Sequence, residues 1–347
     1  QNLYTIVETT VNSLKELGAE PFIVSAMGSH GGGTEEGQRE VLAGYGITEE
    51  RLGVPVVTTV DTVYLGNCAN GRPVWFDRAA YEADLIVPIN RVKLHTDFVG
   101  PIQSGLCKML VIGLGNHKGC SAVHEEAPEV FADAIEETAR LILQKAPVGF
   151  GIAILENAYD KTYAVEAVPA EHLVEREKEL VQIAKGNMPY IMLDEADVIV
   201  CGAIGKDISG AGFDPNILGR SSVLKQFVLH IPRYQRLVLC DVTPASHGNG
   251  IGVGLFDVIT KKVAEQLDLE SMYANAIACN CLGDASVPCT VDDEETAIRV
   301  ALKCCRNIDR DHPRIIRIQN TLHLGEIEVS EALLDAVRAD SRMSLIE

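Results

Sequence analysis

Short apolar runs alternate along the chain with stretches in which apolar residues recur every three to four positions. The short runs predict strands, and the recurring positions predict amphipathic helices. Predicted strands lie at residues 22–27, 56–60, 85–89, 151–155, 198–202, 237–241 and 315–318. Predicted helices lie at residues 35–43, 128–144, 170–185, 256–266 and 294–305. This alternation predicts an α/β fold in which helices cover both faces of mostly parallel sheets.

A polar stretch at residues 185–189 precedes a new apolar run and marks a predicted domain boundary. The chain has 347 residues, which is more than one domain usually contains. We therefore expect two α/β domains, at residues 1–188 and 189–312, with the active-site cleft between them. For residues 313–347 the pattern leaves open a return to the first domain.

The formal net charge of -19 excludes several kinds of partner. Nucleic acid and anionic membrane surfaces would repel such a chain, so neither is expected. Apolar runs such as residues 109–114 are far shorter than the roughly 20 residues of a membrane helix, and no secretory signal opens the chain. We expect a cytoplasmic protein whose ten cysteines are reduced and mostly buried.

The residues that follow the predicted strands are the first candidates for chemistry, since open α/β sheets bind ligands at the carboxyl ends of their strands. His30 follows the first strand within GSHGGGT. It is either a general base beside glycine N–H groups or a histidine of a local turn. The chain contains neither GxGxxG nor GxxxxGK[ST], so the usual dinucleotide and ATP loops are not predicted.

Local positive charge follows the third strand, where His95 comes after Arg91 and Lys93. Such charge in an acidic protein suits a carboxylate or phosphate ligand, although a solvated basic loop explains it too. Lys108 lies in an apolar run. A buried ammonium requires a partner, a shifted pKa or covalent use, unless the side chain extends to solvent.

Two further regions contain titratable residues. Cys107, His117, Cys120 and His124 offer metal ligands but lack the paired spacing of structural zinc sites. In the second half, Lys206 follows a strand beside Asp207 and can meet a substrate carboxylate or form a structural turn.

His30, His95, Lys108 and His124 occur in the order found in the lactate racemase family, which the chain resembles. The resemblance covers nearly the whole chain. Members of that family carry a nickel-pincer nucleotide, the nickel complex of pyridinium-3,5-bisthiocarboxylic acid mononucleotide. The resemblance implies that His30 and His95 are catalytic, that Lys108 tethers the cofactor, and that His124 ligates nickel. His124 follows Lys108 by sixteen residues, as in the family.

The resemblance also implies that Ser104 and Gly105 contact the cofactor and that Lys206 orients the substrate. The segment QSGLCK departs from the SGG-x-K form, and the stretch between His95 and Lys108 is longer than in the lactate enzymes. These differences suggest a branch with another substrate. The family carries an Arg-containing motif upstream of its first His. The sequence begins directly in a helical pattern at Gln1, so we expect that a segment precedes it.

The activity that the resemblance implies is racemisation or epimerisation of a 2-hydroxy acid, with hydride transfer to and from the tethered cofactor. A small hydroxy acid and a longer sugar acid both remain open as the substrate. Cofactor biosynthesis proteins are the implied partners, and the oligomeric state is not indicated. Two alternatives remain open. One is a metal-dependent hydrolase or lyase that uses His95, His117 and His124, and the other is a non-catalytic relative that binds a metabolite.

Overall fold

The computed structural model describes residues 2–346 of the chain. Contacts divide the chain into two compact units, Gln1–Asn187 (unit 1) and Met188–Glu347 (unit 2). This division lies one residue from the boundary expected from the sequence. Residues 313–347 belong to unit 2, so the return to the first domain that the sequence left open does not occur: β12 (Ile315–Ile318) pairs with β8 (Val198–Cys201).

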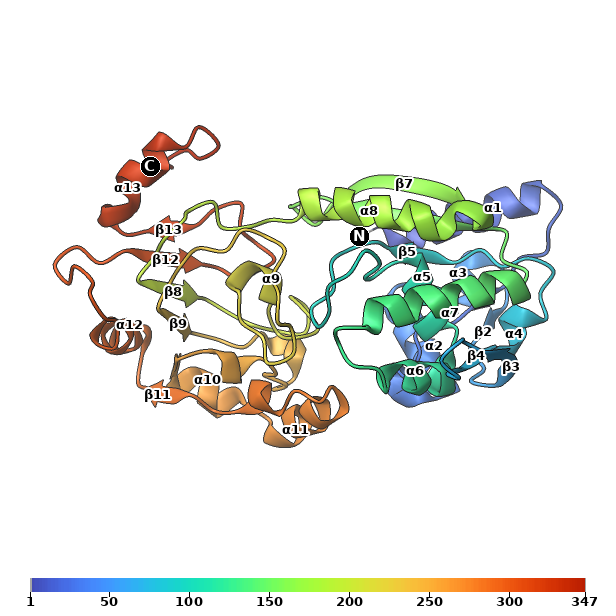
Figure 1. Ribbon diagram of the computed structural model, residues 1–347, viewed down its shortest axis with the longest axis horizontal. Helices are drawn as coiled ribbons and strands as arrows, with labels where there is room; N and C mark the ends of the chain where they lie inside the picture. Colours follow the sequence, from blue (N-terminus) through green and yellow to red (C-terminus); the bar gives the residue numbers. More distant parts are fainter. Residues whose placement is uncertain (1, 347) are drawn as a thin grey trace. The chain divides into compact units, whose positions relative to one another are not determined.

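Unit 2 is built on a six-stranded sheet with the order β11-β10-β9-β8-β12-β13 (Figure 1). The remaining strands are β9 (Arg236–Leu239), β10 (Val258–Thr260), β11 (Cys289–Val291) and β13 (Glu328–Val329). Every neighbouring pair is parallel except β12 and β13. The α/β class is therefore confirmed, and this sheet is mostly parallel.

Both faces of the unit 2 sheet are covered, which explains why its strands read as continuous apolar runs. Val198 and Val200 of β8 pack with α12 (Glu294–Lys303) on one face. Ile199 and Cys201 face the opposite side. That side is covered by α9 (Pro215–Leu218), α10 (Lys261–Gln266), α11 (Leu269–Ala278) and α13 (Leu334–Ala339).

The strand order of unit 2 reverses at β8. Strands β9, β10 and β11 follow on one side of it, and β12 lies on the other side. In open α/β sheets the carboxyl edge at such a switch point is the usual place for a ligand. Lys206 follows β8 at this edge, where the Gly202 N–H donates to the carbonyl oxygen of Ile318 at 2.9 Å.

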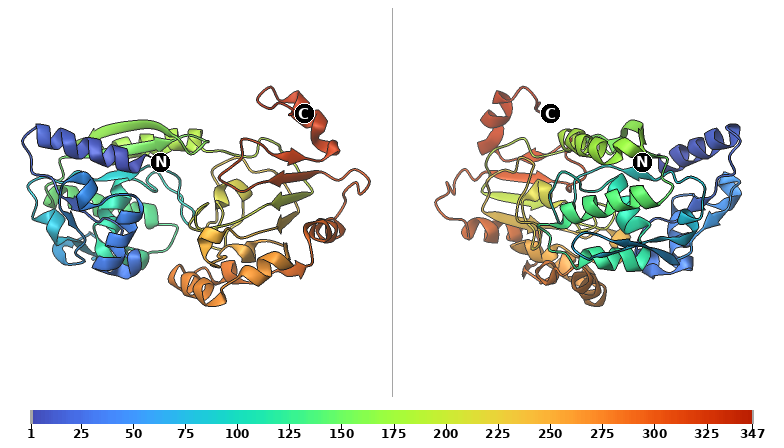
Figure 2. Two further views of the ribbon diagram at one scale, coloured as in Figure 1. Left: turned by 180° about the vertical axis from the view of Figure 1, so that it is seen from behind. Right: turned by 45° about the vertical axis from the view of Figure 1, so that its right-hand side comes forward.

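Unit 1 contains three small sheets in place of one large sheet. They pair β1 (Ile23–Val24) with β2 (Val56–Val57), β3 (Thr62–Asn67) with β4 (Pro73–Asp77), and β6 (Phe150–Glu156) with β5 (Ile89–Arg91) and β7 (Thr162–Pro169). Helix α8 (Leu173–Asn187) packs on β6 and β7, as Figures 1 and 2 show in green. The β3–β4 pair and β7 add antiparallel pairing that the sequence pattern did not predict.

The remaining helices of unit 1 surround these sheets. They are α1 (Leu3–Glu16), α2 (Glu35–Gly44), α3 (Glu49–Leu52), α4 (Arg78–Tyr81) and α7 (Phe131–Lys145). Between β5 and α7 the chain forms three consecutive helical segments: α5 (Leu106–Lys108), the π-helical turn η2 (Met109–Gly113) and α6 (Asn116–His124). Leu106, Leu110 and Val111 are almost fully buried, so this helical run lies in the interior of unit 1.

No helix among residues 2–346 reaches the length and apolar character needed to cross a bilayer. The same described residues contain ten cysteines, none of which forms a disulfide, and six of which are buried.

Replacing Ile199 with Ala should lower the free energy of unfolding by about 2–5 kcal/mol, because the side chain is 0% exposed in the central strand of unit 2. Urea titration followed by circular dichroism measures the loss. Leu282→Ala is the control in the same unit, since Leu282 is 66% exposed, and it should change the value by less than about 0.5 kcal/mol. Equal losses in both variants would contradict this packing.

Candidate active site

Lys108 and His95 are in direct contact within unit 1. The Lys108 Nζ lies 2.6 Å from His95 Nε2. His95 is carried by the segment after β5, where its backbone N–H donates to Gln103 Oε1 at 2.8 Å. Only 16% of the His95 side chain is exposed. The structure thus brings together two of the predicted site residues, which the family resemblance assigned as a base and as the cofactor tether.

The hydrogen bonds of His95 determine which of its ring nitrogens carries the proton. The backbone N–H of Asp97 donates to His95 Nδ1 at 3.1 Å, so Nδ1 is the acceptor. In a neutral imidazole the proton then resides on Nε2, which becomes a donor. Its partner, Lys108 Nζ, must accept, and only a neutral amine has a lone pair to accept with. This contact therefore requires Lys108 in its nucleophilic form.

The electrostatic surroundings favour the same protonation states. The pKa of Lys108 is lowered to about 8, chiefly by burial; Asp97 opposes the change and Lys93 contributes to it. Burial also holds the pKa of His95 well below its ordinary value, with Lys108 and Lys93 adding to the effect. His95 is consequently neutral at physiological pH, and a substantial fraction of Lys108 is uncharged from about pH 8 upward.

Lys108 should react with amine-specific reagents at a lower pH than an ordinary lysine. Only the neutral amine reacts, and at pH 8 a pKa of about 8 gives a neutral fraction roughly 100-fold above that of a lysine at about 10.4. Reductive methylation over a pH series, followed residue by residue by mass spectrometry, gives the midpoint. Exposed Lys118 is the internal control. A Lys108 midpoint equal to that of Lys118 would contradict the geometry.

His124, the predicted nickel ligand, lies at the end of α6 with an exposed imidazole. Its Nδ1 donates to the carbonyl oxygen of Cys120 at 2.7 Å, which leaves Nε2 as the nitrogen with a lone pair. A histidine that ligates a metal commonly makes this second bond to a carbonyl, because it fixes the tautomer and the ring orientation. The Cys120 thiol also lies 3.5 Å from Nδ1, and that contact raises the pKa of His124.

Helix α6 is held at both of its ends. At the start, Asn116 donates to buried Asp77 at 2.8 Å. Just beyond the end, the buried Arg72 guanidinium forms ion pairs with Glu126 and with Glu137 of α7. These contacts attach the helix that carries His124 to the β4 strand and to α7.

Two phenylalanines connect His95 with His124. The His95 ring stacks on Phe98 with centroids 4.2 Å apart, and Phe98 contacts Phe131 at 4.8 Å. The His124 ring meets the edge of Phe131 at 5.1 Å. Both phenylalanines are buried, so the two imidazoles rest against one apolar wall. Sequence reasoning assigned neither phenylalanine a role, because a buried aromatic residue has no signal that separates it from ordinary core.

His30 lies on the loop between β1 and α2, with its side chain exposed. Its Nδ1 donates to the carbonyl oxygen of Met27 at 2.7 Å, so Nε2 is available as a base. The loop contacts the helical run: the Gly28 N–H donates to Gly113 at 3.0 Å, and Ser29 Oγ lies 4.0 Å from Cys120 Sγ. His30 thus lies on a loop that packs against the helical run containing Lys108 and His124.

The tight turn at His30 explains the glycines beside it. Gly31 has a φ of 64°, and a Cβ there would lie 2.5 Å from the Gly37 backbone. After the turn, the Thr34 side chain accepts the Gly37 N–H and begins α2. The turn of the backbone therefore requires glycine here, independently of any ligand.

Ser104 and Gly105, the predicted cofactor contacts, precede α5. Ser104 exchanges backbone hydrogen bonds with Lys93 on the strand side of the site. Gly105 is the N-cap of α5. Both residues lie shortly before Lys108 in the chain, and their role toward a cofactor stays a prediction.

Lys206 lies in unit 2, in the turn after β8. Its Nζ donates to the carbonyl oxygen of Gly210 at 2.7 Å and to the side-chain oxygen of Asn275. The carboxylate of the adjacent Asp207 accepts a hydrogen bond from the Thr243 hydroxyl. The ammonium is therefore turned toward polar groups of its own unit at the carboxyl edge of the sheet.

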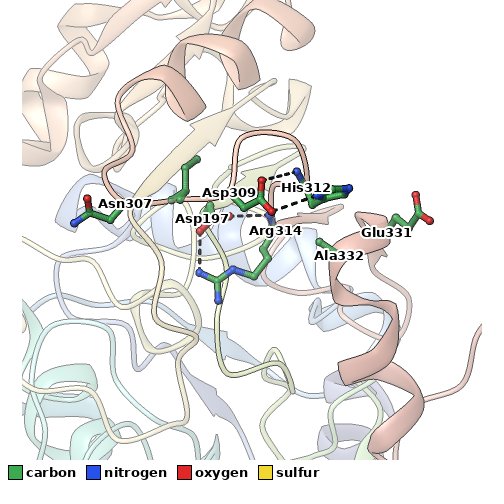
Figure 3. A pocket seen from close by; sticks show the side chains of 8 residues that line it. Asp197, Asn307, Asp309, His312, Arg314, Glu331 and Ala332 are labelled. Carbon is green, nitrogen blue, oxygen red and sulfur yellow. Dashed lines mark hydrogen bonds and ion pairs between the residues drawn. The ribbon is translucent and has the colours of Figure 1, made fainter.

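A hollow of about 510 Å³ lies at the opposite, amino edge of the unit 2 sheet, where Asp197 and Arg314 precede β8 and β12. Figure 3 shows two pairs among its polar side chains, Asp197 with Arg314 and Asp309 with His312. None of the predicted site residues lines it.

His117 is exposed on α6. Among residues 2–346, no group of three His, Cys, Asp or Glu side chains is arranged to hold a metal ion. A three-ligand site of His95, His117 and His124 therefore has no support from the geometry.

The comparison with family models covers the part of the chain that contains this site. Residues 1–133 match the model described as the lactate racemase N-terminal domain. The matched region includes His30, His95, Lys108 and His124, so the resemblance drawn from the sequence is confirmed for this region. A search of curated protein sequences finds no match.

Two solved structures show weak likeness to large parts of the chain. One is the lactate racemase apoprotein from Thermoanaerobacterium thermosaccharolyticum, with 13% identity, 73% coverage of each chain and a TM-score of 0.41. The other is a Thermotoga maritima protein, with 11% identity, coverage of 93% of this chain and 85% of that chain, and a TM-score of 0.42.

Proposed function

We propose that this protein is a racemase or epimerase of a small 2-hydroxy acid that works with a nickel-pincer nucleotide tethered to Lys108. The observation that carries the proposal is the contact of the buried Lys108 amine with His95, 2.6 Å apart, within residues that match the lactate racemase N-terminal domain. A lysine can form a covalent bond to a cofactor only as the neutral amine, and apolar surroundings favour that form.

The residues present fit such a cofactor. Lys108 would hold it covalently, and His124 Nε2, which faces away from the Cys120 carbonyl bond, would be the single protein ligand to nickel. Ser104 and Gly105 would lie beside the tethered group. When bound, the cofactor supplies hydride acceptance and return at the substrate carbon.

The two catalytic histidines have complementary ring protonation. His30 Nε2 has a lone pair, because its Nδ1 proton is committed to Met27. His95 Nε2 carries a proton, because its Nδ1 accepts from Asp97. His30 can thus take the substrate hydroxyl proton through Nε2, whereas neutral His95 donates a hydrogen bond from Nε2 and acts as an acid only once it has taken up a second proton.

In this proposal Lys206 binds the substrate carboxylate. Its ammonium follows β8 at the switch point of the unit 2 sheet and already interacts with the Gly210 carbonyl and the Asn275 side chain. A carboxylate would meet this charge with little cost of ordering the lysine. Cofactor biosynthesis proteins are the proposed partners, since the tethered group must be made elsewhere.

The tether is tested by intact mass after co-production with the cofactor-making enzymes. Wild-type protein should gain a covalent adduct together with stoichiometric nickel. Lys108→Ala should gain no adduct, because the attacking amine is absent, whereas the matched control Lys118→Ala should load normally. His124→Ala should retain the adduct and lose nickel. No adduct on the wild type under these conditions would overturn the proposal.

The base is tested with His30→Gln in protein whose loading has been confirmed by mass. Racemisation of a responsive 2-hydroxy acid should fall by about 10²–10⁴-fold, because a general base of the required basicity is lost. Chiral chromatography of a panel of hydroxy acids and sugar acids measures the rate. Full activity would remove His30 from the mechanism. Ligand binding by loaded wild type without any turnover would favour the metabolite-binding alternative.

A further inference from the structure

Side chains from two other elements form hydrogen bonds with the backbone at the first turn of α5, the helix that carries Lys108. Asn90 of β5 donates its side-chain amide to the Gly105 carbonyl oxygen at 2.8 Å. On the other side, Glu177 of α8 accepts the backbone N–H of Cys107 at 2.8 Å. We call these two side chains the clamp. They fix the residues directly before Lys108 to two elements that are distant in sequence.

Glu177 is an unusual residue for the centre of a helix–helix contact. It is 0% exposed, and its Oε1 is buried without a hydrogen-bond partner. It forms no ion pair among the described contacts, so it does not neutralise a buried cation. A carboxyl placed at the start of a helix can instead satisfy backbone N–H groups that the helix leaves without partners.

Gly105 is shaped by the same contact. Its φ of -179° is extended backbone that any residue adopts, so conformational freedom does not explain the glycine. A Cβ at this position would lie 2.6 Å from the Glu177 carboxyl carbon. The glycine of the SG segment therefore leaves space for Glu177, independently of any role toward a cofactor.

The carboxyl group can perform this task without a negative charge. Burial raises the pKa of Glu177 to about 7, while the N–H groups of Cys107 and Leu106 oppose the rise. Near neutral pH the group is thus divided between its two protonation states. Its carbonyl-type oxygen accepts a hydrogen bond in either state, which makes glutamine a close chemical substitute.

We propose that Asn90 and Glu177 are positioning residues for Lys108: by fixing residues 105–107 they direct the Lys108 side chain into the contact with His95. The proposal depends on the tether role of Lys108 for its functional meaning. The clamp itself acts in the empty protein, where it keeps the amine in its buried place. Without the clamp the first turn would loosen, and Lys108 would gain access to water.

The test follows the reductive methylation of Lys108 in the empty protein over a pH series. Wild type should show a midpoint near the pKa of about 8 that burial gives Lys108. Glu177→Met keeps helix propensity and volume but removes the acceptor, and Asn90→Ala removes the opposite contact. In each variant the midpoint should move up toward the value of an ordinary lysine. Glu177→Gln should keep the wild-type midpoint.

Glu179→Met is the matched control, because Glu179 lies on the same helix and 65% of its side chain is exposed. It should leave the midpoint unchanged. A merely structural Glu177 would lower the melting temperature without moving the Lys108 midpoint, and that result in folded Glu177→Met and Asn90→Ala would overturn the proposal. If Glu177→Met does not fold, Asn90→Ala decides alone. Failure of cofactor loading in the wild type would overturn the proposed function and leave these midpoints unaffected.

Discussion

The candidate site depends on the burial of one lysine. An ammonium loses most of its hydration in an apolar surrounding, so burial lowers the pKa of Lys108 and shifts it toward the neutral amine. Lys108 lies in a helical run whose neighbours Leu106, Leu110 and Val111 belong to the core, so its own side chain has little access to water. His95, itself held neutral, then becomes a suitable partner, because its Nε2 proton can be donated to the amine. This buried helical run also determines where Phe98, Phe131 and the glycine-containing loop of His30 lie.

The order of His30, His95, Lys108 and His124 was accessible from the sequence, and the apolar context of Lys108 correctly suggested an unusual amine. What the sequence could not supply were contacts between distant segments. Phe98 and Phe131 join His95 to His124, and Glu177 lies 70 residues beyond Cys107. Such pairs have no local periodicity. Gly105 illustrates the limit well: the SG segment suggested a ligand contact, whereas the space that Glu177 needs accounts for the glycine.

The fold shows the same division between local and distant information. The unit 2 strands at residues 198–202, 237–241 and 315–318 were predicted because continuous apolar runs mark strands buried on both faces. The predicted helix at residues 256–266 joined two elements, since Phe256, Ile259 and Val263 repeat with helical spacing. The β-branched Val258, Ile259 and Thr260 instead form β10, and the Thr260 side chain caps α10. The position of residues 313–347 was undetermined because β12 pairs with a strand more than 100 residues away.

The clamp and the tautomers together suggest why the site is built on helices and not on loops alone. A covalent tether needs an amine that is neutral and correctly aimed, and both properties come from a rigid, apolar helical run. A proton-transferring histidine needs a ring orientation fixed by its second nitrogen, and backbone groups of Met27, Asp97 and Cys120 supply this for His30, His95 and His124 respectively. Backbone partners do not titrate. The protonation pattern of the site therefore follows from the chain path itself, and it persists while the substrate changes charge.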